Sequence, residues 1–405
     1  MNVNTPNDHD VFAPILATAE RVLSQAYGSQ IRLGDVTRLT RKGRRNVILR
    51  CRNLSGHLSP SFIIKKVDVD NYNPSDTHSW DVRRFISDWA GVQFLSTIPS
   101  ALPYSPRFYG GDYDGGFVIL EDLGPHRSLV EPLLEEDAAS AEDAVLTFAA
   151  RLGQLHAATI GQSAVFARFF QVINPHAVPF AHEVEWLAKR VRQFQTGLER
   201  LAVRPEVRLS QDLEMLITAI AEPGPFWAYI HADPCPDNVF ITDGHVRLID
   251  FEFGRFGHAL LDGTYGRMLF PTCWCANRLP SALVARMEAV YRAALVQGCP
   301  AAQEDRVFDT ALVRVCGFWL VETVVRHLEE ALGADRAWGI ATIRARLLSR
   351  LEAFITTADV FHQLEALRGT AHRVLEVLCK RWPEVDPLPL YPAFHKVSPG
   401  QPKTT

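Results

Sequence analysis

Hydrophobic positions recur with two different periods along this chain, and the change of period divides it into two parts. Residues 11–27 carry apolar side chains at helical spacing, which predicts a leading helix. Short apolar segments separated by Gly and Pro follow, and they predict strands with one helix among them. The strands are expected at 36–39, 47–51, 61–67, 107–110 and 116–120, and the helix at 82–95.

The pattern after residue 125 is mainly helical. Apolar side chains recur at spacings of three and four in residues 143–158, as on the buried face of a helix. Residues 181–201 and 282–382 also have mostly helical patterns, and one β-rich segment, 227–253, lies between them. From residue 383 the chain is rich in proline and has no periodicity, which predicts an extended or disordered tail.

These patterns predict a bilobal plan with three regions. Residues 1–122 form a small β-rich lobe with its leading helix. Residues 123–382 form a large helical lobe, and residues 383–405 form the proline-rich tail.

Composition narrows the class of protein. The chain has 405 residues, 47% of them hydrophobic, which is enough to bury a core in two or three domain-sized parts. A net charge of -4 without a long basic run gives no sign of a nucleic-acid partner. The first ten residues are polar and acidic, and charges interrupt the longest apolar stretches, so we expect a cytoplasmic protein with no membrane partner.

The seven cysteines are scattered and odd in number, which argues against a disulfide framework. Cys273 and Cys275 flank Trp274 as a C-x-C pair, but no second ligand pair accompanies them. A packing or pocket-lining role is therefore favoured over a structural zinc site.

The strongest chemical signal lies in the β-rich segment, which reads YIHADPCPDNVFITDGHVRLIDFE. His231, Asp233 and Asn238 stand as H-x-D-x-x-x-x-N, and Asp250 follows after a turn at Asp243 and Gly244 and a short apolar strand. Phosphoryl transfer needs a carboxylate near the acceptor hydroxyl and oxygen ligands for Mg²⁺. Each residue alone is more often structural, but the ordered set indicates a phosphoryl-transfer site.

HADPCPDNV followed by LIDFE resembles the catalytic and metal-binding segments of the aminoglycoside phosphotransferase and choline kinase superfamily. The resemblance implies an α+β, bilobal protein-kinase-like fold, with a small antiparallel-sheet N-lobe and a large, mainly helical C-lobe. It implies Asp233 as the catalytic base, with His231 as a member of the catalytic loop. Asn238 and Asp250 would be the magnesium ligands, and Glu252 fills the family's second acidic position.

A kinase-like site also needs a lysine on a central strand that reaches the nucleotide phosphates. Phe62-Ile63-Ile64-Lys65-Lys66 offers two, which face opposite sides of a strand. The family's pattern of three apolar residues before the lysine selects Lys65, with Lys66 facing solvent. The alternative is that both are solvated lysines on an edge strand.

The helix after this lysine carries an acidic partner in the resembling proteins. They have Glu there, whereas this chain offers Asp88, which is one methylene shorter and makes a looser, water-bridged or absent ion pair conceivable. Asp81 at the helix start is a second candidate, and it fits an N-cap equally well.

Two further segments are expected at the nucleotide. The turn at 41–46 includes Gly43 and Asn46 and lies where a phosphate-covering loop belongs, although a basic hairpin tip is usually only solvated. Residues 116–124 resemble the family's hinge, which implies adenine contacts from the Glu121 carbonyl and the Leu123 amide. The alternative is a linker between lobes without a ligand.

Several other side chains remain open. Trp274 and Phe270 either stack on an acceptor ring or belong to the core, and the acidic residues after the hinge either attract a polyamine or begin a solvated helix. His156 is interpreted as a satisfied core histidine. Asp262 resembles a family acid that caps the next helix, a structural role.

Together these features predict a kinase that transfers the γ-phosphoryl group of ATP or GTP, with Mg²⁺, to a hydroxyl of an amino sugar, amino alcohol or related metabolite. The partners would be the nucleotide and this small-molecule acceptor. A catalytically weak, nucleotide-binding regulator is the alternative that the Asp88 substitution favours. A protein kinase fits less well, because Glu252 stands where the Asp-Phe-Gly glycine would be.

Overall fold

The computed structural model describes residues 8–56, 59–70, 72–180, 184–242 and 244–395. Their chain packs into two compact units. Unit 1 comprises the described residues of Met1–His126, Gln162–Phe180 and Arg247–Arg255, and unit 2 comprises those of Arg127–Gly161, Ala181–Val246 and Phe256–Thr405. The domain boundaries predicted at residues 122 and 382 stay a prediction.

Unit 1 is built on a five-stranded antiparallel sheet with the strand order β1-β2-β3-β5-β4. Its elements are α1 (Asp8–Tyr27), β1 (Leu33–Arg38), β2 (Asn46–Asn53), β3 (Ser61–Val67), α2 (Trp80–Leu95), β4 (Phe108–Asp112), β5 (Phe117–Glu121) and α5 (Ser163–Ile173).

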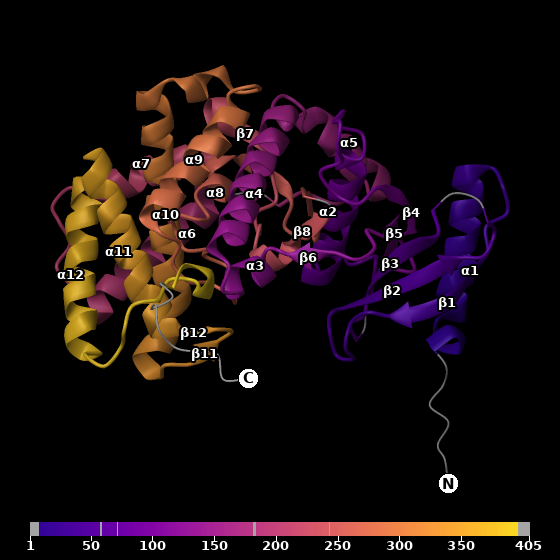
Figure 1. The fold of residues 1–405 in the computed structure, drawn as a ribbon. Helices are drawn as coiled ribbons and strands as arrows, with labels where there is room; N and C mark the ends of the chain where they lie inside the picture. The colour runs from indigo at the N-terminus through magenta and orange to yellow at the C-terminus, as the bar shows by residue number, and fades with distance from the viewer. Residues whose placement is uncertain (1–7, 57–58, 71, 181–183, 243, 396–405) are drawn as a thin grey trace, which may run out of the picture. The chain divides into compact units, whose positions relative to one another are not determined.

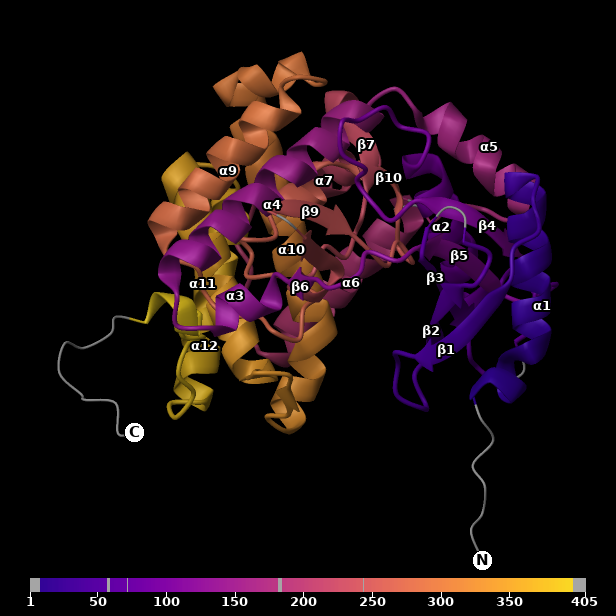
Figure 2. The ribbon, with the colours of Figure 1, turned by 45° about the vertical axis from the view of Figure 1, so that its right-hand side comes forward.

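Helix α1 covers one face of this sheet (Figures 1 and 2). Its apolar side chains recur at helical spacing and pack on alternate residues of the central strands, forming one buried cluster. The main members are Phe12, Leu16, Ala19 and Leu23 from the helix and Val47, Leu49, Phe62, Ile64, Phe117 and Ile119 from the strands.

The alternation along β3 places its lysines. Phe62 and Ile64 are fully buried in the α1 cluster, so Lys65 between Ile64 and Lys66 points to the opposite face of the sheet. That face carries α2, whose Asp88 is also buried. The sheet therefore directs Lys65 towards an acidic side chain that lies 23 residues later in the chain.

Unit 2 is mainly helical and contains short strands. Its helices are α3 (Val130–Leu134), α4 (Ala138–Thr159), α6 (Val184–Arg200), α7 (Leu209–Ala221), α8 (Leu260–Gly263), α9 (Ser281–Leu295), α10 (Asp305–Gly333), α11 (Ile343–Phe361) and α12 (Glu365–Arg381). Its 3₁₀ turns are Gly224–Phe226, Pro236–Asn238, Pro300–Gln303 and Pro392–Phe394. Its strands are β6 (Arg127–Ser128), β7 (Trp227–Ile230), β8 (Val239–Thr242), β9 (His245–Leu248), β10 (Arg255–His258), β11 (Ala337–Trp338) and β12 (Ala341–Thr342).

Close approach of two helices organises this unit. Helix α4 packs against α9 with Gly153 at the contact, where an added Cβ would lie only 2.4 Å from the carbonyl oxygen of Tyr291. Only glycine allows the two backbones to come this near.

The strands pair as β6-β8-β9 and β10-β7, so the predicted β-rich segment is confirmed. Asp243, in the predicted turn between β8 and β9, lies outside the described residues.

The predicted α+β class is confirmed, with a small antiparallel sheet in the first part of the chain and a large helical second part. The described part of the tail differs from the expected extended surface segment. Leu388 and Tyr391 are buried, and Tyr391 donates its backbone N–H to the Arg278 carbonyl. None of the helices in the described ranges is long and apolar enough to cross a membrane.

Candidate active site

An ion cluster around Lys65 forms the centre of the site in unit 1. The Lys65 ammonium lies 2.8 Å from the Asp88 carboxylate and 2.5 Å from that of Asp250, and Glu252 is 3.7 Å away. Lys66, by contrast, donates to the carbonyl of its neighbour Val67. The structure therefore brings Lys65, Asp88 and Asp250 together.

Burial and charge act in opposite directions on these groups. Burial alone would lower the pKa of Lys65, but attraction by Asp250, Asp88 and Glu252 outweighs it and raises that pKa well above the usual range. Burial raises the pKa of Asp88, while Lys65 opposes this shift. The ammonium is thus held charged, as binding of a polyphosphate requires.

Asp88 has a second task. One of its carboxylate oxygens accepts the backbone N–H of Phe251 at 2.8 Å, so it anchors the residue next to Asp250. Asp250 itself has a left-handed backbone, with φ of 67°. Such a conformation is uncommon for a residue other than glycine and persists where surrounding contacts hold it. Asp88, being shorter than Glu, still reaches Lys65 directly.

Glu252 is held by Arg45, from the predicted phosphate-covering turn, and by Arg84 from α2, and the sequence did not indicate either contact. The Arg45 guanidinium donates to it at 2.6 Å, and Arg84 and the Asn46 amide donate to it as well. Burial would raise the pKa of Glu252, but Lys65, Arg45 and Arg84 lower it to about 2. Arg45 and Arg84 lie more than 160 residues before Glu252, so no local pattern links them.

In the predicted phosphate-covering turn, Gly43 is open to its surroundings, whereas the Asn46 side chain is bonded within the protein. Gly43 has a φ of 81°, and an added Cβ would meet no atom within 4 Å. The Asn46 side chain is engaged with Glu252, as described above. Asp81 pairs with Arg45 at 2.7 Å, so the carboxylate paired with Lys65 on this helix is that of Asp88.

The predicted hinge lies at the end of β5. The Glu121 carboxylate accepts from the Arg247 guanidinium at 2.5 Å and from the backbone N–H of Arg107 at 3.1 Å. Its side chain is thus committed to the protein, and only backbone groups of Glu121 and Leu123 are candidates for adenine contacts. Those contacts stay a prediction.

The predicted catalytic loop of unit 2 follows strand β7. Within it, the Asn238 amide nitrogen donates to the Asp233 carbonyl at 3.0 Å, and the backbone N–H of Cys235 donates to the same carbonyl at 2.7 Å. The backbone N–H of Asp233 is 3.3 Å from Nδ1 of His231. The structure therefore brings His231, Asp233 and Asn238 together in one compact turn.

Asp262 supports this loop from below rather than capping a helix. It lies within α8, and its carboxylate accepts the backbone N–H groups of His231 at 2.7 Å and Ala232 at 3.0 Å. Ala232 has a left-handed φ of 65°, which these two bonds stabilise. His156 is fully buried between Asp262 and the Tyr291 hydroxyl, as a satisfied core histidine.

A second segment contacts the loop from the side. Thr272 donates to the Asp233 carboxylate at 2.5 Å, and the Trp274 indole donates to Asp237 at 2.8 Å. Between them, Cys273 forms a disulfide with Cys235, with Cα atoms 5.4 Å apart. The argument against a disulfide framework needs a correction for this one pair, because spacing in sequence does not show that residues 38 apart meet.

The same segment settles one open question about aromatic side chains. Phe270 is completely buried, so it belongs to the core and does not stack on an acceptor. Trp274 is 36% exposed, and Cys275 is buried. Trp274 therefore remains available to a ligand on its exposed side.

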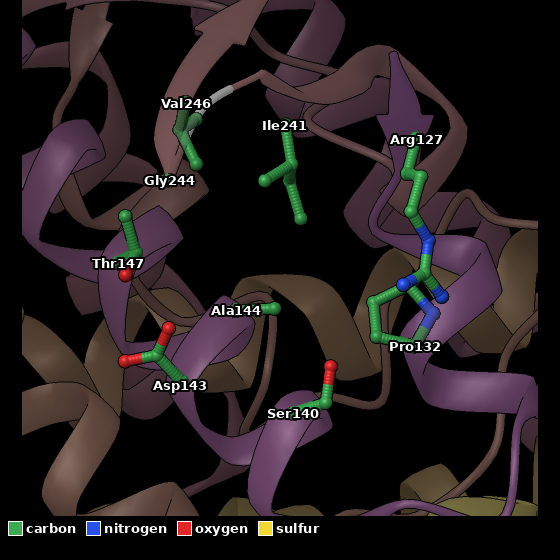
Figure 3. Close-up of a pocket in the computed structure, with 9 residues that line it drawn as sticks. All are labelled: Arg127, Pro132, Ser140, Asp143, Ala144, Thr147, Ile241, Gly244 and Val246. Carbon is green, nitrogen blue, oxygen red and sulfur yellow. The ribbon is translucent and has the colours of Figure 1, made fainter.

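Unit 2 also has a small pocket away from the predicted catalytic loop, and its volume is too small for a typical substrate. It lies between helix α4 and strands β8 and β9, with Arg127 and Pro132 on its other side (Figure 3). Its volume of about 90 Å³ is well below that of typical ligand sites. None of the predicted site residues lines it.

Comparison with known proteins gives a family match. Residues 90–304, just over half of the chain, match the phosphotransferase enzyme family. The matched residues include the predicted catalytic loop and Asp250, whereas Lys65 and Asp88 precede them. A comparison with curated proteins found no match.

Solved structures with similar folds have low sequence identity to this chain. A choline kinase from Cryptosporidium parvum is 12% identical, with a TM-score of 0.48 over 84% of this chain and 93% of that chain. A putative aminoglycoside phosphotransferase from Ralstonia eutropha is 13% identical, with a TM-score of 0.44 over 90% and 98% of the two chains.

The family match covers the H-x-D-x-x-x-x-N segment and the LIDFE segment on which the resemblance rested, and that resemblance is confirmed. The protein is an enzyme, a phosphotransferase. The chain belongs to the phosphotransferase enzyme family.

Proposed function

We propose that this phosphotransferase transfers the γ-phosphoryl group of ATP or GTP to a hydroxyl group of a small molecule, such as an amino sugar or an amino alcohol. The observation that carries the proposal is the contact of Lys65 with both Asp88 and Asp250. A buried, charged ammonium fixed between two carboxylates is suited to the phosphates of a nucleotide, which bring the opposite charge.

Asp233 is the proposed catalytic base. In the reaction, the acceptor oxygen forms a bond to the γ-phosphorus while the bond from that phosphorus to the bridging oxygen breaks. The acceptor proton passes to the Asp233 carboxylate, and the nucleoside diphosphate leaves. His231 would shape the loop, because Nδ1 of its ring faces the backbone N–H of Asp233.

Asn238 and Asp250 are the proposed magnesium ligands. The amide nitrogen of Asn238 donates to the Asp233 carbonyl, which leaves its amide oxygen for a cation. The Asp250 side chain is 38% exposed despite its contact with Lys65. Both donor atoms are hard oxygens, which fit Mg²⁺. When bound, the ion would neutralise charge that develops on the phosphates.

The nucleotide is proposed to contact the backbone of Glu121 and Leu123 through its base and the turn at Gly43 through its phosphates. The left-handed Gly43 lies in an exposed turn whose backbone N–H groups are suited to an anion. The Asn46 side chain is occupied by Glu252, so its contribution would come from its backbone.

The weak-regulator alternative loses its main support. It rested on Asp88 being too short to pair with the lysine, and the two side chains are in direct contact. A matching carboxylate on α2 is what an active nucleotide site needs.

The first test combines nucleotide binding with turnover. Thermal unfolding is measured with Mg·ATP and Mg·GTP, and ADP or GDP release is then measured with choline, ethanolamine and gentamicin as acceptor probes. The wild type should be stabilised by at least one nucleotide. Asp233→Asn should retain that stabilisation and lose turnover.

Asp143→Asn is the matched control, because Asp143 is an exposed aspartate on α4 outside the proposed site. It should behave as wild type in both measurements. The proposed mechanism would be contradicted if neither nucleotide stabilised the wild type. Full turnover by Asp233→Asn would contradict it as well.

A further inference from the structure

Three consecutive residues of unit 2 contact alternate residues of the catalytic loop. Thr272 contacts Asp233, Cys273 is bonded to Cys235, and the Trp274 indole donates to Asp237. We name residues 269–275 the clasp segment. Its register places a hydroxyl group on the carboxylate of the proposed base and fixes the loop at two further points.

We propose that Thr272 is a positioning residue, which orients the Asp233 carboxylate for catalysis. The inference rests on the proposed function, in which Asp233 is the base. The Thr272 hydroxyl lies 2.5 Å from Oδ1 of Asp233 and donates to it. A hydrogen bond from a fixed donor restrains rotation of the carboxylate and stabilises its charged form.

Tyr265 shares a hydrogen bond with Thr272 in which either hydroxyl group can be the donor. Its hydroxyl lies 3.0 Å from Oγ1 of Thr272. Burial raises the pKa of Tyr265 well above its ordinary value, so its hydroxyl stays protonated and can act as donor. When Tyr265 donates to Thr272, the single Thr272 proton is directed to Asp233. The Ala232 carbonyl, 3.2 Å from the Tyr265 hydroxyl, competes for the same proton.

The clasp segment is held rigidly from behind by two buried arginines of α11. Arg350 donates to the carbonyl oxygens of Leu269 and Phe270, and Arg346 donates to those of Cys273 and Trp274 at 2.6 and 2.7 Å. Leu269 and Phe270 both have left-handed backbones, with φ of 60° and 47°. These bonds stabilise a conformation that would otherwise be strained.

Burial of these two arginine side chains behind the clasp segment is energetically unfavourable. Arg346 and Arg350 are fully buried, and burial lowers their pKa values to about 10 and about 9. The hydrogen-bond acceptors that they contact in this segment are carbonyl oxygens rather than carboxylates. Burying a charged side chain to hold a loop costs free energy. Such a cost is expected where the position of the loop matters, as in the support of a catalytic group.

The test compares Thr272→Val with Thr272→Ser. Valine keeps the shape and removes the hydroxyl, whereas serine keeps the hydroxyl. ADP release is followed across pH with Mg·ATP and with the acceptor probes named above. For Thr272→Val we expect kcat to fall about tenfold at an unchanged KM for ATP, and the acid limb of the kcat profile to move to higher pH. Thr272→Ser should restore both.

A second measurement does not depend on the acceptor. The carboxyl carbons of ¹³C-labelled aspartate are titrated by NMR, and the Asp233 signal is assigned by its loss in Asp233→Asn. In Thr272→Val the midpoint of this signal should move to higher pH. Tyr265→Phe should move it in the same direction by less, which keeps the test decisive if the valine variant folds poorly.

The outcomes separate the two proposals. Full turnover by Asp233→Asn would overturn the proposed base whatever Thr272 does. If Asp233→Asn is inactive while Thr272→Val keeps the wild-type kcat, pH profile and NMR midpoint, the positioning role of Thr272 alone is overturned. A lower melting temperature without change in these readouts would show a merely structural contact.

Discussion

The Lys65 ammonium lies 2.8 Å from the Asp88 carboxylate, although Lys65 belongs to strand β3 and Asp88 to helix α2. Asp88 also accepts the backbone N–H of Phe251. One buried carboxylate thus connects the lysine to the segment that presents Asp250. Removing any member of this arrangement should disturb the other two.

Lys65→Met should weaken nucleotide binding and turnover, whereas Lys66→Met should leave both near wild type. Only Lys65 points to the face that carries Asp88, since Lys66 contacts the carbonyl of Val67. We expect a loss of at least tenfold in kcat/KM for ATP, as for the loss of a charge-assisted contact. The comparison is made by steady-state ADP release, and a larger effect from Lys66→Met would reverse the assignment.

Asp262→Ala should both destabilise the protein and lower turnover. The buried N–H of His231 and the partly buried N–H of Ala232, in the predicted catalytic loop, would lose their acceptor, at a cost of about 1–3 kcal/mol for the buried group and less for the other. Urea unfolding measures the first effect and ADP release the second.

Asp212→Ala is the matched control, because Asp212 is also buried and accepts the N–H of Leu367 far from the loop in sequence. It should destabilise without lowering kcat. An equal loss of kcat in both variants would mean that destabilisation alone explains the effect.

The Cys235–Cys273 disulfide should stabilise unit 2. It closes a loop of 38 residues, for which chain entropy predicts about 4 kcal/mol. Thiol titration of the unfolded chain should find five thiols before reduction and seven after it. Dithiothreitol should lower the melting temperature of the wild type and of Cys379→Ser but not of Cys273→Ala. Seven thiols without reduction would contradict the bond.

Stability should fall as the pH drops below about 6.5. Burial, with repulsion from His156, lowers the pKa of His258 to about 3 in the folded protein, and its Nδ1 accepts the Leu260 N–H. The unfolded chain binds a proton near pH 6.5, so between these values it holds more protons than the folded chain. The contribution of His258 to stability is therefore fully present above pH 6.5 and is lost by about 1.4 kcal/mol for each pH unit below it.

Urea unfolding at pH 7.5, 6.5, 5.5 and 4.5 measures this dependence. His258→Gln should have a shallower slope below pH 6.5, even if it is less stable at pH 7.5. The exposed His372 on α12 provides the control, and His372→Gln should keep the wild-type slope. Equal slopes in all three proteins would exclude His258 as the source.

The sequence by itself determined the elements and the chemical class. Periodicity located α1, α2 and the five strands of the sheet within a few residues, because amphipathic spacing follows directly from burial on one face. The order of His231, Asp233, Asn238 and Asp250 predicted phosphoryl transfer, which the family match supports. The roles assigned to these residues remain predictions.

Only the tertiary structure decided which side chains meet. The choice of Asp88 over Asp81 as the partner of Lys65 depends on the direction in which α2 crosses the sheet, and either acid fits the pattern of the sequence. Arg45 and Arg84 reach Glu252 from far along the chain, and no local signal predicts such a contact.

The clasp segment shows the same limit in unit 2. From its sequence, with two cysteines and a tryptophan, a packing or pocket-lining role is favoured over metal binding, and Trp274 either stacks on a ligand or belongs to the core. The contact of the clasp segment with Asp233 depends on buried arginines of α11 that lie about 80 residues later and bind its carbonyl groups. Local patterns report the burial of one element, whereas contacts between distant elements arise only when the whole chain packs.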